Sequence, residues 1–179
     1  MKVNRLFSMI LVLLIGGTLA TVAVFAQKKK VDKKYKNRYQ CIEVTRFDVK
    51  QGVDFPLDWS ITMTEEMITQ LKETAKFKDI CREGETPVDP NAPALKLVGT
   101  VIEYKKGSRA ARYLVGFGAG STVIKAHIKI MDRATGEVLF EDDVDGKVVM
   151  GAIGGESVGA TRGLAKEIAG KTKKEFFSS

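Results

Sequence analysis

The chain has 179 residues, of which 44% are hydrophobic and 28% charged, and its formal net charge is +7. A surplus of positive charge is typical of nucleic-acid-binding proteins when it lies on the folded surface. Here the surplus is confined to the N-terminal region, because from Tyr39 onward 20 basic residues face 21 acidic ones, a net charge of −1. We therefore expect no nucleic-acid partner.

Residues 1–26 have the plan of a secretory signal peptide. The basic residues Lys2 and Arg5 precede an apolar run over residues 9–25, and small residues stand before a cut after Ala26. An uncleaved inner-membrane anchor is the alternative, since the run is near the minimum of about 17 residues for a span. The lysines that follow also resist translocation. The pattern favours cleaved export to the periplasm or the outside.

Residues 27–38 are predicted to form a basic, disordered linker, because they hold seven lysines and arginines and few apolar residues. A solvated spacer is favoured over contact with an anionic membrane surface. Residues 39–179 have the length of one domain with a single core, and we expect one α+β envelope domain there.

The first half of this domain is expected to contain one strand and one helix. Residues 41–49 are rich in β-branched and aromatic side chains, which indicates a strand. Thr62 and Glu65 form a capping-box pattern, which predicts a helix over residues 62–78. Its apolar positions are Met63, Met67, Leu71 and Ala75. Three of the four prolines then fall within residues 84–93, which indicates a loop.

The second half reads as three strands and a helix. Strands are expected over residues 95–104, 122–131 and 138–149, and the middle one alternates strictly between apolar and polar side chains. An amphipathic helix is expected over residues 156–176. The order β-α-β-β-β-α predicts an α+β fold, with a mostly antiparallel sheet of about four strands and two helices.

The segment Ala134-Thr135-Gly136 suits a three-residue hairpin loop and so predicts a register. The predicted pairs are Arg133 with Glu137, Met131 with Leu139, Lys129 with Glu141, His127 with Asp143, and Lys125 with Asp145. Glu141, Asp143 and Asp145 also imitate the start of a calcium loop, but the twelfth position is Ala152 rather than a glutamate. A cross-strand charge ladder is therefore favoured over a metal site.

Residues 107–120 read GSRAARYLVGFGAG. Together with a second glycine-rich run near residue 155 and the 132–136 hairpin, this segment resembles a bacterial envelope family described as domain of unknown function 4410. The resemblance covers roughly residues 41–174. It implies an exported or lipid-anchored protein for which no activity is established. The chain departs from the lipid-anchored members because it has no cysteine at the signal cut.

The glycines of this loop do not fit a nucleotide-binding motif. Gly116, Gly118 and Gly120 have the wrong spacing for a dinucleotide fingerprint and run into a strand, and no lysine follows them as a phosphate-binding loop requires. The single histidine, His127, has no nucleophile beside it. We therefore expect no cofactor, no metal and no enzymatic activity.

The same loop is the predicted partner-binding site. Its apolar tip is flanked by arginines, a pattern that suits a partner surface or a lipid interface. The residues expected to bind are Arg109, Arg112, Tyr113 and Phe117. The alternative is that the apolar residues of this loop belong to the domain core.

Two further patterns concern packing. Cys41 and Cys81 are the only cysteines, and an outgoing strand followed by a returning helix of similar length would bring them together, which favours a disulfide in an oxidising compartment over two free thiols. Glycines recur every four residues before and within the last helix, which favours close contact with the chain's own sheet or with another subunit. These glycines are Gly151, Gly155, Gly159 and Gly163.

The sequence thus predicts an exported cell-envelope protein that acts as a non-enzymatic binding or assembly domain. The expected partner is an envelope protein or a second copy of the chain. The alternative is a domain that binds a small anion, or an enzyme, using the loop rich in arginine and glycine.

Overall fold

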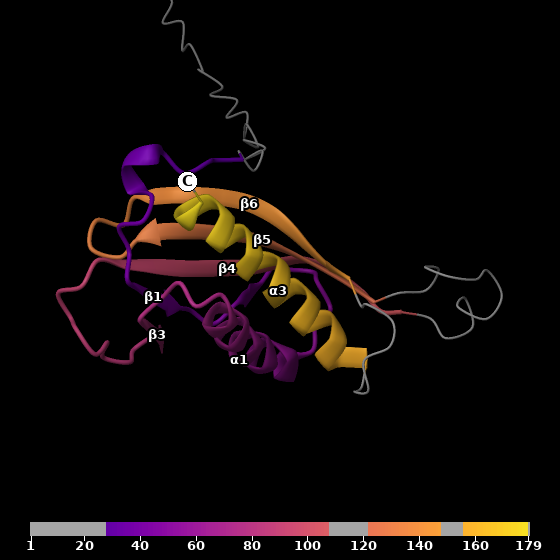
Figure 1. Cartoon of the computed structure of the whole chain (residues 1–179). Helices are drawn as coiled ribbons and strands as arrows, with labels where there is room; N and C mark the ends of the chain where they lie inside the picture. Colours follow the sequence, from indigo (N-terminus) through magenta and orange to yellow (C-terminus); the bar gives the residue numbers. More distant parts are fainter. Residues whose placement is uncertain (1–27, 108–121, 148–155, 179) are drawn as a thin grey trace, which may run out of the picture.

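The computed structural model describes residues 28–107, 122–147 and 156–178. These residues form one mixed β-sheet with two long helices packed on the same face (Figure 1). The strands are β1 (Cys41–Val44), β2 (Asp48–Val49), β3 (Asp79–Arg82), β4 (Ala94–Lys105), β5 (Val123–Asp132) and β6 (Val138–Lys147). The helices are η1 (Lys33–Tyr35), α1 (Leu57–Glu73) and α3 (Glu156–Phe177).

The strand order is β3-β1-β4-β5-β6, and β2 also pairs with β4. Strand β1 is parallel to β3 and β4, and β2 is parallel to β4, whereas β5 is antiparallel to both β4 and β6. The α+β class and the single domain are confirmed. The predicted sheet of about four mostly antiparallel strands is wrong, because the sheet has six strands and is mixed.

Two local features account for this difference. The predicted first strand divides into β1 and β2. Between them Phe47 turns inward and packs on Gly99, where a Cβ atom would lie only 2.1 Å from the Phe47 ring. Strand β3 has only four residues, two of them charged, and it pairs with β1 after a crossover through α1. The pairing of β3 with β1 joins segments far apart in the chain, so the local sequence pattern does not predict it.

Helix α1 begins five residues earlier than the capping pattern predicted. Pro56 occupies the N-cap, and Thr62 lies inside the helix, where its hydroxyl donates to the Asp58 carbonyl at 3.2 Å. The predicted capping box is therefore wrong, because the fixed φ of proline already starts the helix. Of the four predicted apolar positions, Met63, Met67 and Leu71 are confirmed, since their side chains are fully buried, whereas Ala75 is exposed. The helix ends at Glu73, and Ala75 follows with a φ of 52°.

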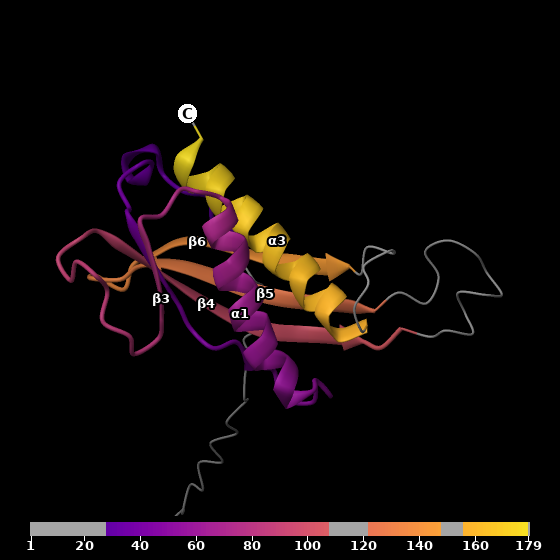
Figure 2. The ribbon, with the colours of Figure 1, turned by 60° about the horizontal axis from the view of Figure 1, so that its bottom comes forward.

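The core lies between the sheet and the two helices, which run side by side over one sheet face (Figure 2). Every second side chain of β4 and β5 turns toward the helices, and the strict alternation predicted for β5 is confirmed. The core side chains of these two strands are Leu95, Leu97, Val101, Ile124, Ala126, Ile128 and Ile130. Helix α3 contributes Ala160, Leu164, Ala165, Ile168, Ala169 and Phe176.

The sheet and helix α3 approach each other closely at Gly146 of β6. A Cβ at this position would lie 2.5 Å from Leu164 Cβ and 2.7 Å from the Leu164 backbone. The predicted glycine strip is only partly described: Gly159 and Gly163 are half-buried in α3, while Gly151 and Gly155 lie outside the described residues.

The predicted disulfide is not formed: Cys41 and Cys81 are both free thiols, and both are buried. They lie on neighbouring strands, but Cys41 is level with Asp79 and Cys81 is level with Glu43. A stagger of two residues on adjacent strands corresponds to about 8 Å between the two Cα atoms. Bridged cysteines require less than about 7 Å. Sequence spacing brought the two elements together correctly but could not fix their register.

The predicted disordered linker also differs from the structure. Residues 28–38, here called the strap, lie beside β6 (Figure 1). Asn37 in the strap has a φ of 56°, and its backbone N–H donates to the Phe176 carbonyl at 2.8 Å. Tyr39 follows and is buried against Phe176, with ring centroids 6.1 Å apart. The strap is therefore attached to the domain at the C-terminal end of α3.

Candidate functional site

The predicted charge ladder exists on the sheet face opposite the helices. Lys125 pairs with Asp145 at 3.5 Å, and Lys129 with Glu141 at 3.4 Å. Between them, the two ring nitrogens of His127 lie 2.8 Å from carboxylate oxygens of Asp143 and Glu141. The predicted pairs of Lys125, His127 and Lys129 are confirmed. The two predicted pairs nearest the loop are wrong, because a bulge shifts the register after Ile130: Met131 pairs with Val138 rather than Leu139, and the backbone N–H of Asp132, not that of Arg133, donates to the Glu137 carbonyl.

The ladder borders a hollow of about 360 Å³, lined also by Lys50, Thr100 and Ile102. The carboxylates beside it already have basic partners. Within the described residues, no group of three or more His, Cys, Asp or Glu side chains is placed to hold a metal ion. The acidic run that imitates a calcium loop therefore serves as one half of the ladder in this part of the chain.

Strand β6 lies at one edge of the sheet, and its outer side pairs with the strap. The Lys29 backbone N–H donates to the Glu141 carbonyl at 2.9 Å, and the Glu141 N–H donates back to the Lys29 carbonyl at 3.2 Å. The Lys29 ammonium donates to the Val138 carbonyl. The strap thus adds an extended segment antiparallel to an edge strand, which is the geometry of strand addition.

Asp142 is the charged centre of this contact. Its side chain points to the helix side of the sheet and is 9% exposed, where it accepts from Lys171 of α3 and pairs with Lys28 of the strap at 3.3 Å. Burial opposes ionisation, but the hydrogen bonds and charges of Lys171 and Lys28 outweigh it and lower the pKa of Asp142. One carboxylate therefore joins the strap, the edge strand and the last helix.

The rest of the strap is held by few apolar contacts. Val31 is its only buried side chain, and Tyr35 is half-buried with its hydroxyl donating to Glu137 at 2.6 Å. Asp32 caps η1 by accepting from the Lys34 backbone N–H at 3.1 Å. Charge and backbone pairing, more than burial, hold this segment in place.

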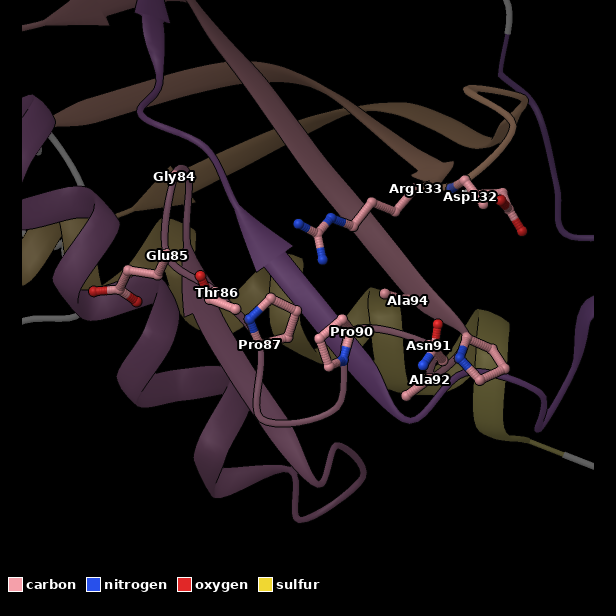
Figure 3. Close-up of a pocket in the computed structure, with 12 residues that line it drawn as sticks. Gly84, Glu85, Thr86, Pro87, Pro90, Asn91, Ala92, Ala94, Asp132 and Arg133 are labelled. Atoms are coloured by element: carbon pink, nitrogen blue, oxygen red, sulfur yellow. Dashed lines mark hydrogen bonds between the residues drawn. The ribbon is translucent and has the colours of Figure 1, made fainter.

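A larger pocket of about 810 Å³ lies between the 84–94 loop and the β5–β6 hairpin (Figure 3). Its charged groups already have partners. Arg133 donates to Glu43 at 2.8 Å, and Glu85 accepts from the Arg82 backbone and guanidinium. The carboxylate of Asp132 accepts from Tyr39 and from the backbone N–H groups of the hairpin. This pocket presents prolines and alanines beside charges that are already paired, so β6 is the stronger candidate site.

The predicted partner-binding loop lies outside the described residues, so Arg109, Arg112, Tyr113 and Phe117 remain a prediction. Asp142, Lys28 and Lys29 are the site residues that the sequence analysis missed. A signal for Asp142 was present, since it is an acid at an inward position of the β6 alternation.

In the parts of the chain that the structure describes, no helix is long and apolar enough to cross a membrane.

The family model described as "Domain of unknown function (DUF4410)" matches residues 58–152, which is 95 of the 179 residues. The chain belongs to the DUF4410 family. The match spans α1, the sheet strands β3 to β6 and the loop rich in arginine and glycine. No curated protein matches the DUF4410 chain.

Two solved structures share the fold of this DUF4410 chain. One is a PelC dodecamer from Paraburkholderia phytofirmans that carries a point substitution; its chain has a TM-score of 0.55 and 12% identity to this one. The match covers 87% of this chain and 98% of the PelC chain. A second PelC dodecamer from the same organism has a TM-score of 0.52 and 17% identity, and covers 79% and 91%. At such identities the likeness shows a common fold.

Proposed function

We propose that this DUF4410 chain is an exported, non-enzymatic domain of the bacterial cell envelope that assembles with copies of itself. Export follows from the signal pattern and places the protein in the periplasm or outside the cell after cleavage at Ala26. The residues from Tyr39 onward then form the envelope domain, and the strap precedes it.

The observation that carries this proposal is the pairing of Lys29 with Glu141 at the edge of the sheet. An edge strand offers a row of backbone donors and acceptors, so it binds extended segments of other chains unless it is covered. In this molecule the edge accepts a basic segment through reciprocal backbone hydrogen bonds and an acidic side chain, Asp142. Such an edge is suited to binding a polypeptide rather than to transforming a small molecule.

Two further facts support assembly. The PelC chains that share this fold were solved as dodecamers, so the architecture is compatible with a closed oligomer. The positive charge of the exported chain is concentrated in the strap, while β6 and its hairpin carry a cluster of acids. These acids are Glu137, Glu141, Asp142, Asp143 and Asp145.

Sedimentation velocity of the exported chain, residues 27–179, tests the proposal. We expect species larger than the monomer to increase with protein concentration and to decrease at high salt, because screening weakens contacts between exposed charges. A chain that remains monomeric at every concentration and salt would contradict self-assembly. A thermal shift produced by a small anion in such a monomer would favour the alternative, a small-anion-binding domain.

A further inference from the structure

The strap is attached to the domain at one end and held loosely along the rest of its length. Of residues 28–36 only Val31 is buried, and Tyr35 is half-buried. The polar contacts of these residues with the domain are the Lys29 backbone bridge and its ammonium bond to the Val138 carbonyl, the ion pair of Lys28 with Asp142, the Tyr35 bond to Glu137, and a 3.0 Å bond from Lys36 to the Ser178 carbonyl. Exposed hydrogen bonds and ion pairs contribute little net stability, because water competes for the same groups. Lifting the strap from β6 therefore costs little.

The position at which the strap can swing is Asn37. Its φ of 56° lies in the left-handed region, where the chain turns sharply, and asparagine tolerates that region better than most residues. The next buried residue is Tyr39, which is fixed by Phe176 and by a 2.8 Å hydrogen bond from its hydroxyl to Asp132. Residues 28–36 can thus move about Asn37 while Tyr39 keeps its place in the domain.

Charge decides what the freed strap would bind. It carries one acid, Asp32, against seven basic residues, which are Lys28, Lys29, Lys30, Lys33, Lys34, Lys36 and Arg38. The complementary acidic edge is β6 with its hairpin, and each copy of the chain presents the same edge. Every contact that residues 28–36 make within their own chain is therefore available to them on a neighbouring copy, without any new chemistry.

From these observations we infer that the strap is an exchangeable arm: in the assembled protein, residues 28–36 of one copy pair with β6 of another, and Lys29 lies opposite Glu141 across two chains. This inference rests on the proposed self-assembly and names the contact that produces it. Exchange of an identical element is a low-cost route to oligomers, because the same interactions are used in both states.

Two variants with one added cysteine each distinguish exchange from a closed strap. Chains carrying Lys29→Cys are mixed with chains carrying Glu141→Cys, unfolded and refolded together, and oxidised mildly after assembly. Directly opposed residues of an antiparallel pair are close enough for a disulfide. Because neither chain holds both new cysteines, a bond between positions 29 and 141 must join two chains. The expected result is a shift from monomer to covalent dimer mass, with the 29–141 linkage identified by peptide mass spectrometry.

A matched control replaces Lys29→Cys by Lys33→Cys, which lies in η1 and out of register with Glu141. This mixture should stay at monomer mass, and thermal unfolding of each variant verifies that it folds. If sedimentation shows oligomers but no 29–141 linkage is found in them, arm exchange is overturned while the proposed self-assembly still holds. Equal linkage in the control mixture would also overturn it, since random collision would then explain the product. Monomers in sedimentation would instead contradict the proposed function.

Discussion

Lys29 and Glu141 form a reciprocal backbone pair, with N–H to carbonyl distances of 2.9 and 3.2 Å, although they lie near opposite ends of the chain. This pair places a lysine-rich segment along the outer edge of β6. Edge strands that remain open are sites of uncontrolled association, and lysines are a common protection against it. The same contact that protects the edge also defines what the edge can bind, which is a basic, extended polypeptide.

The first prediction concerns acid stability. The folded-state pKa of Asp142 is lowered, so its contribution to stability is present above the ordinary aspartate value of about 3.9 and is lost as pH falls through the folded value. Asp142→Asn should therefore reduce the free energy of unfolding by about 3 kcal/mol at pH 7, since it leaves Lys171 without its partner. Urea unfolding at pH 7 and pH 3 measures this, and the difference from the natural chain should shrink at pH 3.

The matched control for that experiment is Asp143→Asn, one residue along β6. Its side chain is more exposed, at 41%, and pairs with His127 on the open sheet face. Its loss should be below about 1 kcal/mol. Equal losses for the two variants, or an Asp142→Asn loss that does not change with pH, would contradict the role given to Asp142.

The second prediction concerns the contact between β6 and α3. Gly146→Ala should destabilise the domain by about 1 to 3 kcal/mol, because the new Cβ would overlap the backbone of Leu164 and force the helix away. Gly170 in α3 has open space around its Cα, so Gly170→Ala should stabilise the helix by about 0.5 to 1 kcal/mol. Thermal or urea unfolding of both variants measures these changes. If Gly146→Ala left the free energy of unfolding unchanged, the helix would not be closely packed against Gly146.

The third prediction concerns the cysteines. Burial raises the pKa of both the Cys41 and the Cys81 thiols, which keeps them protonated. Alkylating reagents react with the thiolate and only poorly with the protonated thiol. The folded protein should therefore be modified slowly by iodoacetamide, and the unfolded protein should gain two labels without prior reduction. Intact mass spectrometry counts the labels. A requirement for reductant before labelling would show that the two thiols are bridged after all.

The fourth prediction concerns export. If residues 1–26 are a cleaved signal, the native protein should begin at Gln27, so that Lys28 and the strap lie at the very start of the chain. N-terminal mass spectrometry of protein isolated from cells checks this. Recovery of a chain that still begins at Met1, in the membrane fraction, would favour the uncleaved anchor instead.

Local patterns predicted the parts of the fold that depend on neighbours in sequence. Alternation located β5, and the hairpin pattern at residues 134–136 predicted the pairs of Lys129 with Glu141 and of Lys125 with Asp145, although a bulge after Ile130 changes the pairs nearest the loop. Both signals are short-range, since a strand shows its buried face in its own alternation and a tight hairpin sets its own register.

Long-range pairings were not predictable in the same way. Strand β3 and the strap each pair with an element far away in the chain, and neither has the alternation of a long strand. The lysines of the strap suggested a solvated segment because their acidic partners, such as Asp142, lie more than 100 residues away. The candidate site could therefore be recognised only after the sheet placed β6 at its edge.

The most direct test of the account is the molar mass of two charge-reversal variants of residues 27–179, measured by light scattering. Lys28→Glu with Lys29→Glu removes the ammonium groups that contact Asp142 and the Val138 carbonyl and places negative charge beside the acids of β6. Lys33→Glu with Lys34→Glu makes the same change of charge at two strap lysines that form no ion pair with the described residues of β6. The account predicts that the first variant becomes monomeric and that the second keeps the oligomer of the natural chain. If both variants assemble like the natural chain, or both lose assembly equally, the contact between the strap and β6 is not what joins the copies.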